Sequence, residues 1–201
     1  MKNALNKLKE GNQRFIAGST IHDAESINAS RIANQQGQKP FAVILGCSDS
    51  RVPAELIFDQ GLGDLFVVRV AGNIAASTQI GSIEFAVSMF ESPLVIVLGH
   101  SSCGAIHASL NAMKNPEQKV TKHIESLVKQ IKPAINSLAA DGLDTVDAAD
   151  AVKANVMNSV ADLCNQSEVI KSRIAAGLLQ VEGAHYDLQT GLVEFYEKVD
   201  E

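Results

Sequence analysis

The sequence predicts an α/β fold: a mostly parallel central sheet, of about four parallel strands plus an antiparallel edge strand, flanked by helices. Short apolar runs, rich in β-branched residues and without alternation, recur along the chain, as in strands that are buried on both faces. Stretches with helical spacing of apolar residues lie between these runs. Strands that alternate with helices imply right-handed crossovers and therefore a doubly wound sheet.

Residues 1–38 are expected to form an N-terminal helical arm. Apolar residues at roughly helical spacing predict a helix over residues 1–17, namely Leu5, Leu8, Phe15 and Ile16. Residues 19–39 are polar and are expected to be irregular. The apolar face of such a helix must be covered, and we give equal weight to its own domain and to a neighbouring subunit.

Residues 39–201 are expected to form one α/β domain. The predicted parallel strands are residues 41–45, 65–70, 94–99 and, more weakly, 178–181. Residues 186–195 are typical of a turn that leads into an antiparallel edge strand. Two helical stripes consist of Ile80, Ile83, Val87 and Phe90, and of Ala151, Val152, Val156, Val160 and Leu163. Asn115 and Pro116 predict the start of a further helix, with a cap followed by a first-turn proline.

The composition excludes several classes of protein. The 201 residues are 46% hydrophobic and 20% charged, which suits a single domain with a sizeable core. The chain has 17 Lys and Arg but 23 Asp and Glu, so we expect no nucleic-acid partner. No apolar run approaches the roughly 20 residues of a membrane span. The N-terminus lacks the continuous apolar core of a signal peptide, so we expect a cytoplasmic protein without a membrane partner.

Two segments place reactive side chains directly after predicted strands. Cys47 follows the first strand, and His100 and Cys103 follow the third. In open α/β sheets, sites form beyond the carboxyl ends of strands where the strand order reverses. Two thiolates and an imidazole are good zinc ligands, and three protein ligands leave a fourth position open for catalysis. Each residue taken alone is more often structural, but the three together favour a metal site.

Asp49 and Arg51 lie in the same predicted turn as Cys47. An arginine fork can hold a carboxylate through two parallel hydrogen bonds. Beside a metal, Asp49 can either become a ligand and close the site, or stay on Arg51 and accept a hydrogen bond from water. An ordinary surface ion pair is the alternative, but so short a loop cannot carry Asp49 far from Cys47.

These segments resemble the signature of the β-class carbonic anhydrases: Cys-Ser-Asp-Ser-Arg at residues 47–51 and Gly-His-Ser-Ser-Cys-Gly at residues 99–104. The resemblance is close over about residues 1–110 and looser beyond. It includes Gly-Asn-Gln-Arg-Phe (11–15), Gly-Asp-Leu-Phe-Val-Val-Arg (63–69), Ala-Gly-Asn (71–73) and Gly-Ser-Ile-Glu-Phe-Ala (81–86). It implies a zinc-dependent lyase, a carbonate dehydratase, in which zinc-bound hydroxide attacks carbon dioxide and yields bicarbonate and a proton.

The resemblance also implies a role for each matching residue. Cys47, His100 and Cys103 match the ligands of one Zn²⁺ per chain, and Asp49 and Arg51 match the catalytic pair. Gln38, Phe66, Phe85 and Gly104 match the substrate site. Gln38 is expected to reach the substrate across a dimer interface, Phe66 to form an apolar wall, and Phe85 to stand where some members have a tyrosine. A homodimer or homotetramer with pockets at the dimer interface is implied.

One departure from the family concerns an inhibitory bicarbonate site found in some bacterial members, built from a tryptophan, an arginine and a tyrosine. Arg69 and Tyr186 match two of these residues, but Ile44 stands at the tryptophan position and the chain has no tryptophan. With Gln38, this indicates the plant-type, open-site subclass. We therefore expect water on the zinc near neutral pH, with Asp49 held by Arg51.

Three other functions remain open at this stage. A non-catalytic structural zinc module is disfavoured, because the site has no fourth Cys or His ligand. A thiol enzyme would use Cys47 as nucleophile and His100 as base, and metal analysis distinguishes it. A zinc hydrolase of the same fold that acts on carbon disulfide or a related heterocumulene would share the chemistry and differ only in access to its pocket.

Overall fold

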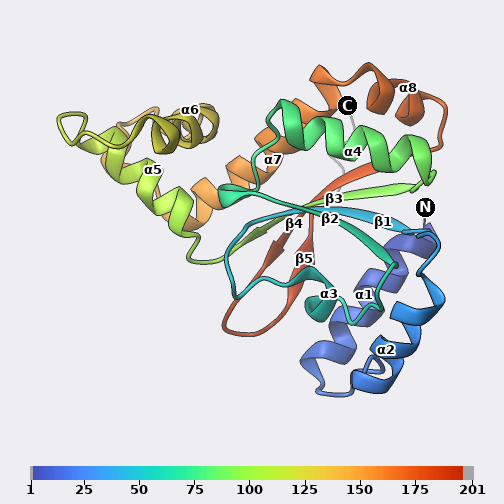
Figure 1. Cartoon of the computed structure of the whole chain (residues 1–201). Coiled ribbons are helices and arrows are strands. Elements are labelled where there is room, and N and C mark those ends of the chain that lie inside the picture. Colours follow the sequence, from blue (N-terminus) through green and yellow to red (C-terminus); the bar gives the residue numbers. More distant parts are fainter. Residues whose placement is uncertain (1, 197–201) are drawn as a thin grey trace.

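Figure 1 shows the computed structural model of the chain, which describes residues 2–196. The helices, in chain order, are α1 (Lys2–Ile16), α2 (Ala24–Ala33), α3 (Ala54–Ile57), η1 (Ala71–Asn73), α4 (Ser77–Met89), α5 (Gly104–Lys114), α6 (Lys122–Asn136), η2 (Leu143–Thr145), α7 (Ala148–Gln166) and α8 (Glu168–Ala175). The strands are β1 (Ala42–Gly46), β2 (Leu65–Arg69), β3 (Leu94–His100), β4 (Gln180–Tyr186) and β5 (Val193–Phe195).

The strands form one sheet in the order β2-β1-β3-β4-β5. The first four strands are parallel, and β5 pairs antiparallel with β4 at the edge. The chain moves from β1 to one side for β2 and then to the other side for β3, so the strand order reverses at β1. The predicted α/β class, with four parallel strands and an antiparallel edge strand, is confirmed.

Helices cover both faces of this sheet (Figure 1). Side chains of α4, α7 and α8 pack on one face, together with Val43 and Leu45 of β1. Side chains of α1 and α3 pack on the other face, together with Ala42 and Ile44. All five residues of β1 are buried, which explains why its sequence is apolar without alternation.

Helix α1 packs on its own chain in this structure. The amide of Asn12 donates to the carbonyls of Ile57 (3.2 Å) and Gly191 (2.9 Å), and its Oδ1 accepts from the N–H of Val193 at 2.8 Å. At Gly11, a Cβ atom would lie 1.7 Å from the carbonyl oxygen of Phe58, so only glycine allows this close approach. Within a single chain, these contacts cover one side of α1 with its own domain.

The expectation that residues 19–39 are irregular was wrong, because α2 spans Ala24–Ala33. Asp23 caps this helix by accepting a hydrogen bond from the N–H of Ser26 at 2.9 Å. No residue of α2 is buried, so its sequence carries no apolar stripe that could reveal it.

Two further boundaries differ from the prediction. Asn115 is the C-cap of α5, and α6 begins only at Lys122, where Thr121 is the N-cap. A proline after a cap residue also follows the end of a helix, and the sequence pattern does not separate the two cases. The predicted strand over residues 178–181 begins at Gln180 and continues to Tyr186, because its pairing with β3 extends as far as His100.

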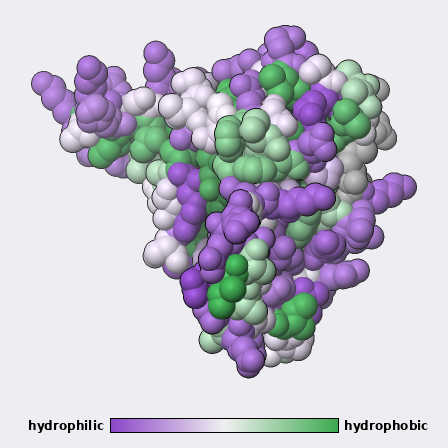
Figure 2. Space-filling view, turned by 45° about the vertical axis from the view of Figure 1, so that its right-hand side comes forward, coloured by the Kyte–Doolittle hydropathy of each residue, from purple (hydrophilic) through white to green (hydrophobic). Residues whose placement is uncertain are grey.

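Helices α5 and α6 extend away from the sheet as a hairpin (Figure 1). Figure 2 shows apolar side chains exposed among hydrophilic ones on one face of the molecule. The exposed large apolar side chains include Phe85 and Met89 on the outer side of α4. Within residues 2–196, no helix combines the length and the apolar character that crossing a membrane requires.

Candidate metal centre

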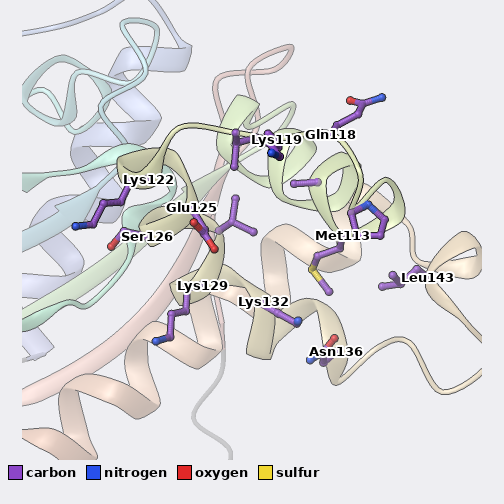
Figure 3. Close-up of a pocket in the computed structure, with 14 residues that line it drawn as sticks. Met113, Gln118, Lys119, Lys122, Glu125, Ser126, Lys129, Lys132, Asn136 and Leu143 are labelled. Carbon is purple, nitrogen blue, oxygen red and sulfur yellow. The ribbon is translucent and has the colours of Figure 1, made fainter.

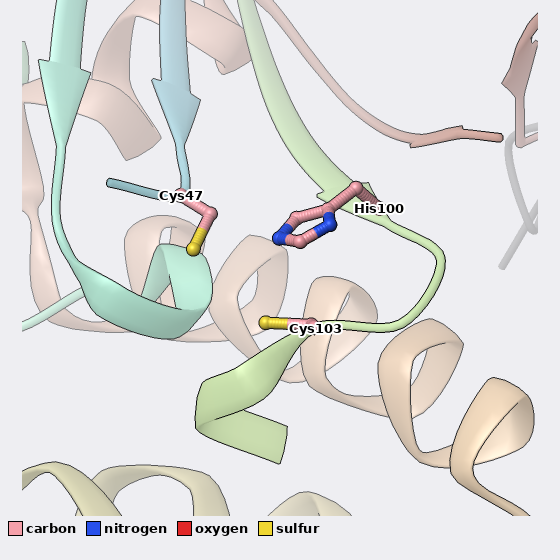
Figure 4. A group of neighbouring side chains, drawn as sticks. All are labelled: Cys47, His100 and Cys103. Atoms are coloured by element: carbon pink, nitrogen blue, oxygen red, sulfur yellow. The ribbon is translucent and has the colours of Figure 1, made fainter. Parts of the chain in front are cut away.

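The carboxyl ends of β1 and β3 bring three side chains together (Figure 4). Cys47 directly follows β1, His100 ends β3, and Cys103 precedes the first residue of α5. Their ligand atoms all lie within 4.8 Å of one another, and all three residues are buried. The crevice between these strands is the point at which the strand order reverses, where such a site is expected.

One ring nitrogen of His100 is held by the backbone, and the other has no partner among the described residues. Its Nδ1 lies 2.9 Å from the carbonyl oxygen of Ser101, a contact that leaves the proton on Nδ1. Its Nε2 is buried and has no hydrogen-bond partner among the described residues. A buried polar atom without a partner is costly, so this lone pair, facing two thiols, fits a metal ion.

The two cysteines are coupled through a shared proton. A hydrogen bond from the Cys103 thiol is the main cause that lowers the pKa of Cys47, and the side chain of His100 lowers it further. The N–H groups of Gly72 and Asp49 each donate to the Cys47 sulfur at 3.4 Å. The same shared proton raises the pKa of Cys103. The lowered pKa of Cys47 favours the thiolate, which is the form in which cysteine binds zinc.

Asp49 lies beside this cluster and is held by Arg51. Arg51 donates from Nε to Oδ1 at 2.9 Å and from Nη2 to Oδ2 at 2.7 Å. The Oδ2 atom lies 4.0 Å from Nε2 of His100. This pair of hydrogen bonds is the main cause that holds the pKa of Asp49 well below its usual range, so the carboxylate is ionised at neutral pH.

Two residues that sequence reasoning did not place in the site hold its loops. Arg69, at the end of β2, donates to the carbonyls of Cys47 (2.9 Å) and Asp49 (2.6 Å). Asn155 of α7 donates to the carbonyl of Gly72 at 2.7 Å. In the sequence, Asn155 is distinguished by being a polar residue between apolar residues of its helix. A search for metal ligands does not select such a residue, because an asparagine amide is not a usual zinc ligand.

The residues predicted to bind substrate are not brought together by one chain. Gln38 is exposed and precedes β1, whereas Cys47 follows it, so the two lie at opposite ends of that strand. The rings of Phe66 and Phe85 lie 6.3 Å apart, where β2 meets α4. Gly104 alone adjoins the cluster, as the first residue of α5.

The two residues matched to an inhibitory bicarbonate site have the following places in this chain. Nε and Nη2 of Arg69 donate to the carbonyls of Cys47 and Asp49. Tyr186 is buried at the end of β4, paired in register with His100.

A groove lies between α5, α6 and η2, away from the metal ligands (Figure 3). Its volume is about 910 Å³, and Lys119, Lys122, Lys129 and Lys132 are among its lining residues. None of the three metal ligands lines it. The volume of a groove is therefore no guide to the position of the metal ligands in this chain.

Comparison with known proteins places these features in one family. The sequence model of the carbonic anhydrases matches residues 42–193. Carbonic anhydrase 2 of Mycobacterium tuberculosis is 45% identical over 188 residues, which are 94% of this chain and 89% of that protein. The carbonic anhydrase of Mycolicibacterium smegmatis is 42% identical over 191 residues, which are 95% of this chain and 91% of that protein.

Solved structures agree in fold. The β-carbonic anhydrase CcaA superposes with a TM-score of 0.74 at 29% identity, over 96% of this chain and 95% of that one. The Coccomyxa β-carbonic anhydrase in complex with acetazolamide superposes with a TM-score of 0.73 at 27% identity, over 95% of this chain and 85% of that one.

Proposed function

Since this chain belongs to the β-class of the carbonic anhydrases, we propose that Cys47, His100 and Cys103 hold the zinc ion with which it interconverts carbon dioxide and bicarbonate. The observation that carries the proposal is the buried, unpartnered Nε2 of His100, which faces two thiols. Zinc analysis of the purified protein tests it directly. We expect one zinc per chain, and a metal-free protein that is fully active would contradict the proposal.

When bound, zinc supplies Lewis acidity that brings the pKa of a water molecule towards neutrality. The residues of the chain then orient the reaction. Asp49 is ionised, so its Oδ2 accepts a hydrogen bond from the reacting water and fixes the direction of its lone pair. Arg51 fixes Asp49 in turn through two hydrogen bonds. The apolar side chains around the ligands limit the access of bulk water.

We assign the chain to the plant-type, open-site subclass. Arg51 holds both carboxylate oxygens of Asp49, and these bonds favour a carboxylate that stays on Arg51 over one that moves to the fourth ligand position. On this assignment, that position would be left to water near neutral pH. A crystal structure of the zinc protein at neutral pH with Asp49 bonded to the metal would overturn it.

The substrate pocket is shared between two subunits on our proposal, in a homodimer that can pair into a homotetramer. Gln38 precedes β1 and Phe66 is the second residue of β2, whereas Cys47 follows the last residue of β1. This separation within one chain supports a pocket to which a second copy contributes these two residues. The exposed side of α4, with Phe85 and Met89, is the apolar surface available for such a contact. The arm of residues 1–38 precedes this catalytic domain and carries Gln38.

Subunit complementation tests the shared pocket. Asp49→Ala and Gln38→Ala are each prepared as homodimers of low activity and are then mixed under conditions that exchange subunits. If Gln38 acts on the partner's zinc, each heterodimer contains one intact site. Random exchange of equal amounts makes half of the dimers heterodimers, so about a quarter of the wild-type activity of the mixture should return. If both residues act within one subunit, every site keeps one defect and no activity returns.

The remaining candidate function is hydrolysis of carbon disulfide or a related heterocumulene by the same site. The 45% identity to a carbonic anhydrase over 188 residues favours carbon dioxide. Turnover of carbon disulfide by the zinc protein, with no hydration of carbon dioxide, would reverse this preference. We place the protein in the cytoplasm, without a membrane or nucleic-acid partner, consistent with its net charge of −6.

A further inference from the structure

We infer that Asn155, a residue of α7, is a positioning residue for the metal ligand Cys47 and acts through the backbone of Gly72. Asn155 is 1% exposed and lies on the buried face of α7, between the apolar residues Val152 and Val156. Its Nδ2 donates to the carbonyl oxygen of Gly72 at 2.7 Å, across 83 positions of sequence. This inference rests on the proposed zinc site.

Gly72 connects this bond to the metal ligand. The N–H of Gly72 donates to the sulfur of Cys47 at 3.4 Å. Two hydrogen bonds therefore connect Asn155 to Cys47 through the backbone of Gly72. A hydrogen bond to a thiolate withdraws charge from the sulfur and fixes the direction of its lone pairs, and both effects tune a bound metal.

Gly72 needs an external anchor because of its own conformation. Its φ of +73° lies in the left-handed region, and a Cβ atom would meet Ile131 Cδ1 at 2.9 Å and Ala105 Cβ at 3.2 Å. The close packing excludes any side chain at this position. A glycine has the widest backbone freedom of any residue, so its N–H keeps one direction only if neighbouring atoms are held. The bond from Asn155 holds the carbonyl of the same residue.

The amide of Asn155 is not explained by packing alone. Its Oδ1 is buried and has no hydrogen-bond partner among the described residues, a state that disfavours an amide in an apolar core. An aliphatic residue would avoid that cost and would continue the stripe formed by Ala151, Val152 and Val156. The hydrogen bond to Gly72 is what an aliphatic residue cannot provide.

The test compares Asn155→Leu, Asn155→Ala and Leu163→Ala in the whole 201-residue chain. Asn155→Leu keeps the approximate size of the side chain but removes the donor. Leu163 is fully buried two turns further along α7 and packs in the core against the sheet, so Leu163→Ala destabilises the same helix without touching Gly72. Far-ultraviolet circular dichroism establishes that each variant is folded at the assay temperature.

Two readouts are independent of turnover: the zinc affinity, measured by competition with a chromogenic chelator, and the sulfur-to-cobalt charge-transfer band of the Co²⁺-substituted protein. We expect both Asn155 variants to lose roughly 10- to 100-fold in zinc affinity and to shift the cobalt band. Leu163→Ala is expected to match the wild type in both readouts.

Two results would overturn the inference: wild-type affinity and spectrum in the Asn155 variants, or the same loss of affinity in Leu163→Ala. A wild-type protein that binds no zinc at all would instead defeat the proposed function. The two failures are therefore distinguishable.

Discussion

Arg51 holds both carboxylate oxygens of Asp49 in a two-point hydrogen-bonded pair, at 2.9 and 2.7 Å. A further bond of 3.0 Å from the N–H of Arg51 to Oδ1 fixes the carboxylate relative to the loop. The guanidinium also lies 3.3 Å from the carbonyl oxygen of Ser102, next to the ligand Cys103. Arg51 thus connects the two loops that carry the metal ligands, and it keeps Asp49 ionised beside them.

Asp49→Ala is expected to lower the rate of carbon dioxide hydration by roughly 100-fold, because the orienting hydrogen-bond acceptor is lost. Zinc content should remain one per chain, since Asp49 is not one of the three clustered ligands. Stopped-flow rates and metal analysis on the same sample check both statements. Unaltered turnover would remove the Asp49–Arg51 pair from the mechanism.

Cys47→Ala is expected to lose zinc and thermal stability together, because a metal that binds only the folded state stabilises it. Cys164→Ala is the matched control: Cys164 is half-buried on α7 and lies outside the cluster. Metal analysis and thermal unfolding, each with and without chelator, separate the two. Chelator should lower the melting temperature of the wild type and of Cys164→Ala, but not that of Cys47→Ala. A Cys47→Ala protein that retains zinc would contradict the ligand assignment.

The sequence was sufficient to find the metal cluster because its three residues lie at or shortly after the ends of two buried strands. Parallel strands end at one edge of the sheet, so Cys47 and His100 had to meet once β1 and β3 were neighbours. Asn155 could not be found in this way. Its role depends on the packing of α7 against the loop of Gly72, and no local pattern encodes a contact across 83 positions.

The strands of the fold could be predicted from the sequence, but helix α2 could not. Strands that are buried on both faces are visible in their composition, whereas α2 has no buried residue and therefore no periodic signal. The position of α1 on its own chain was also beyond the sequence. It depends on the close approach of Gly11 to Phe58. A single glycine within a helix does not reveal which residue packs against it.

Asp59→Asn is expected to destabilise the fold by about 1–3 kcal/mol at neutral pH, because a buried carboxylate with charged partners is lost. Asp59 is buried, and its carboxylate accepts from Arg14 and from the N–H groups of Ile21 and His22. Asparagine tolerates the positive φ of 44° at this position, so the variant tests the charge and not the backbone.

The effect of Asp59→Asn should depend on pH. Burial acts to raise the pKa of Asp59, but the hydrogen bonds from Arg14, Ile21 and His22 outweigh it, and the pKa is lowered. The stabilisation is therefore present above the unfolded pKa of about 3.9 and is lost as the pH falls through the folded value. Urea unfolding should show a constant difference from wild type between neutral pH and about pH 5, which narrows under more acidic conditions. A difference that grows on acidification would contradict the assignment.

Gly11→Ala and Gly81→Ala should change stability in opposite directions. Both glycines lie inside helices, where alanine is favoured by roughly 1 kcal/mol. Within one chain, a Cβ atom at Gly81 meets nothing within 4 Å, so Gly81→Ala should stabilise the individual subunit. At Gly11 the same atom would lie 1.7 Å from the carbonyl oxygen of Phe58, so α1 must move away and stability should fall. Thermal unfolding of both variants checks this, and a stabilised Gly11→Ala would show that α1 does not pack on its own chain.

The most direct test of the central claim is a stopped-flow assay of carbon dioxide hydration on wild-type protein that is stripped of metal and then titrated with zinc. We expect no activity without metal, a linear rise with added zinc, and a plateau at one zinc per chain. The rate should increase towards alkaline pH, because two thiolates reduce the acidity that the ion confers on water. Full activity in the stripped protein, or none in the zinc-loaded protein, would contradict a zinc carbonic anhydrase built on Cys47, His100 and Cys103.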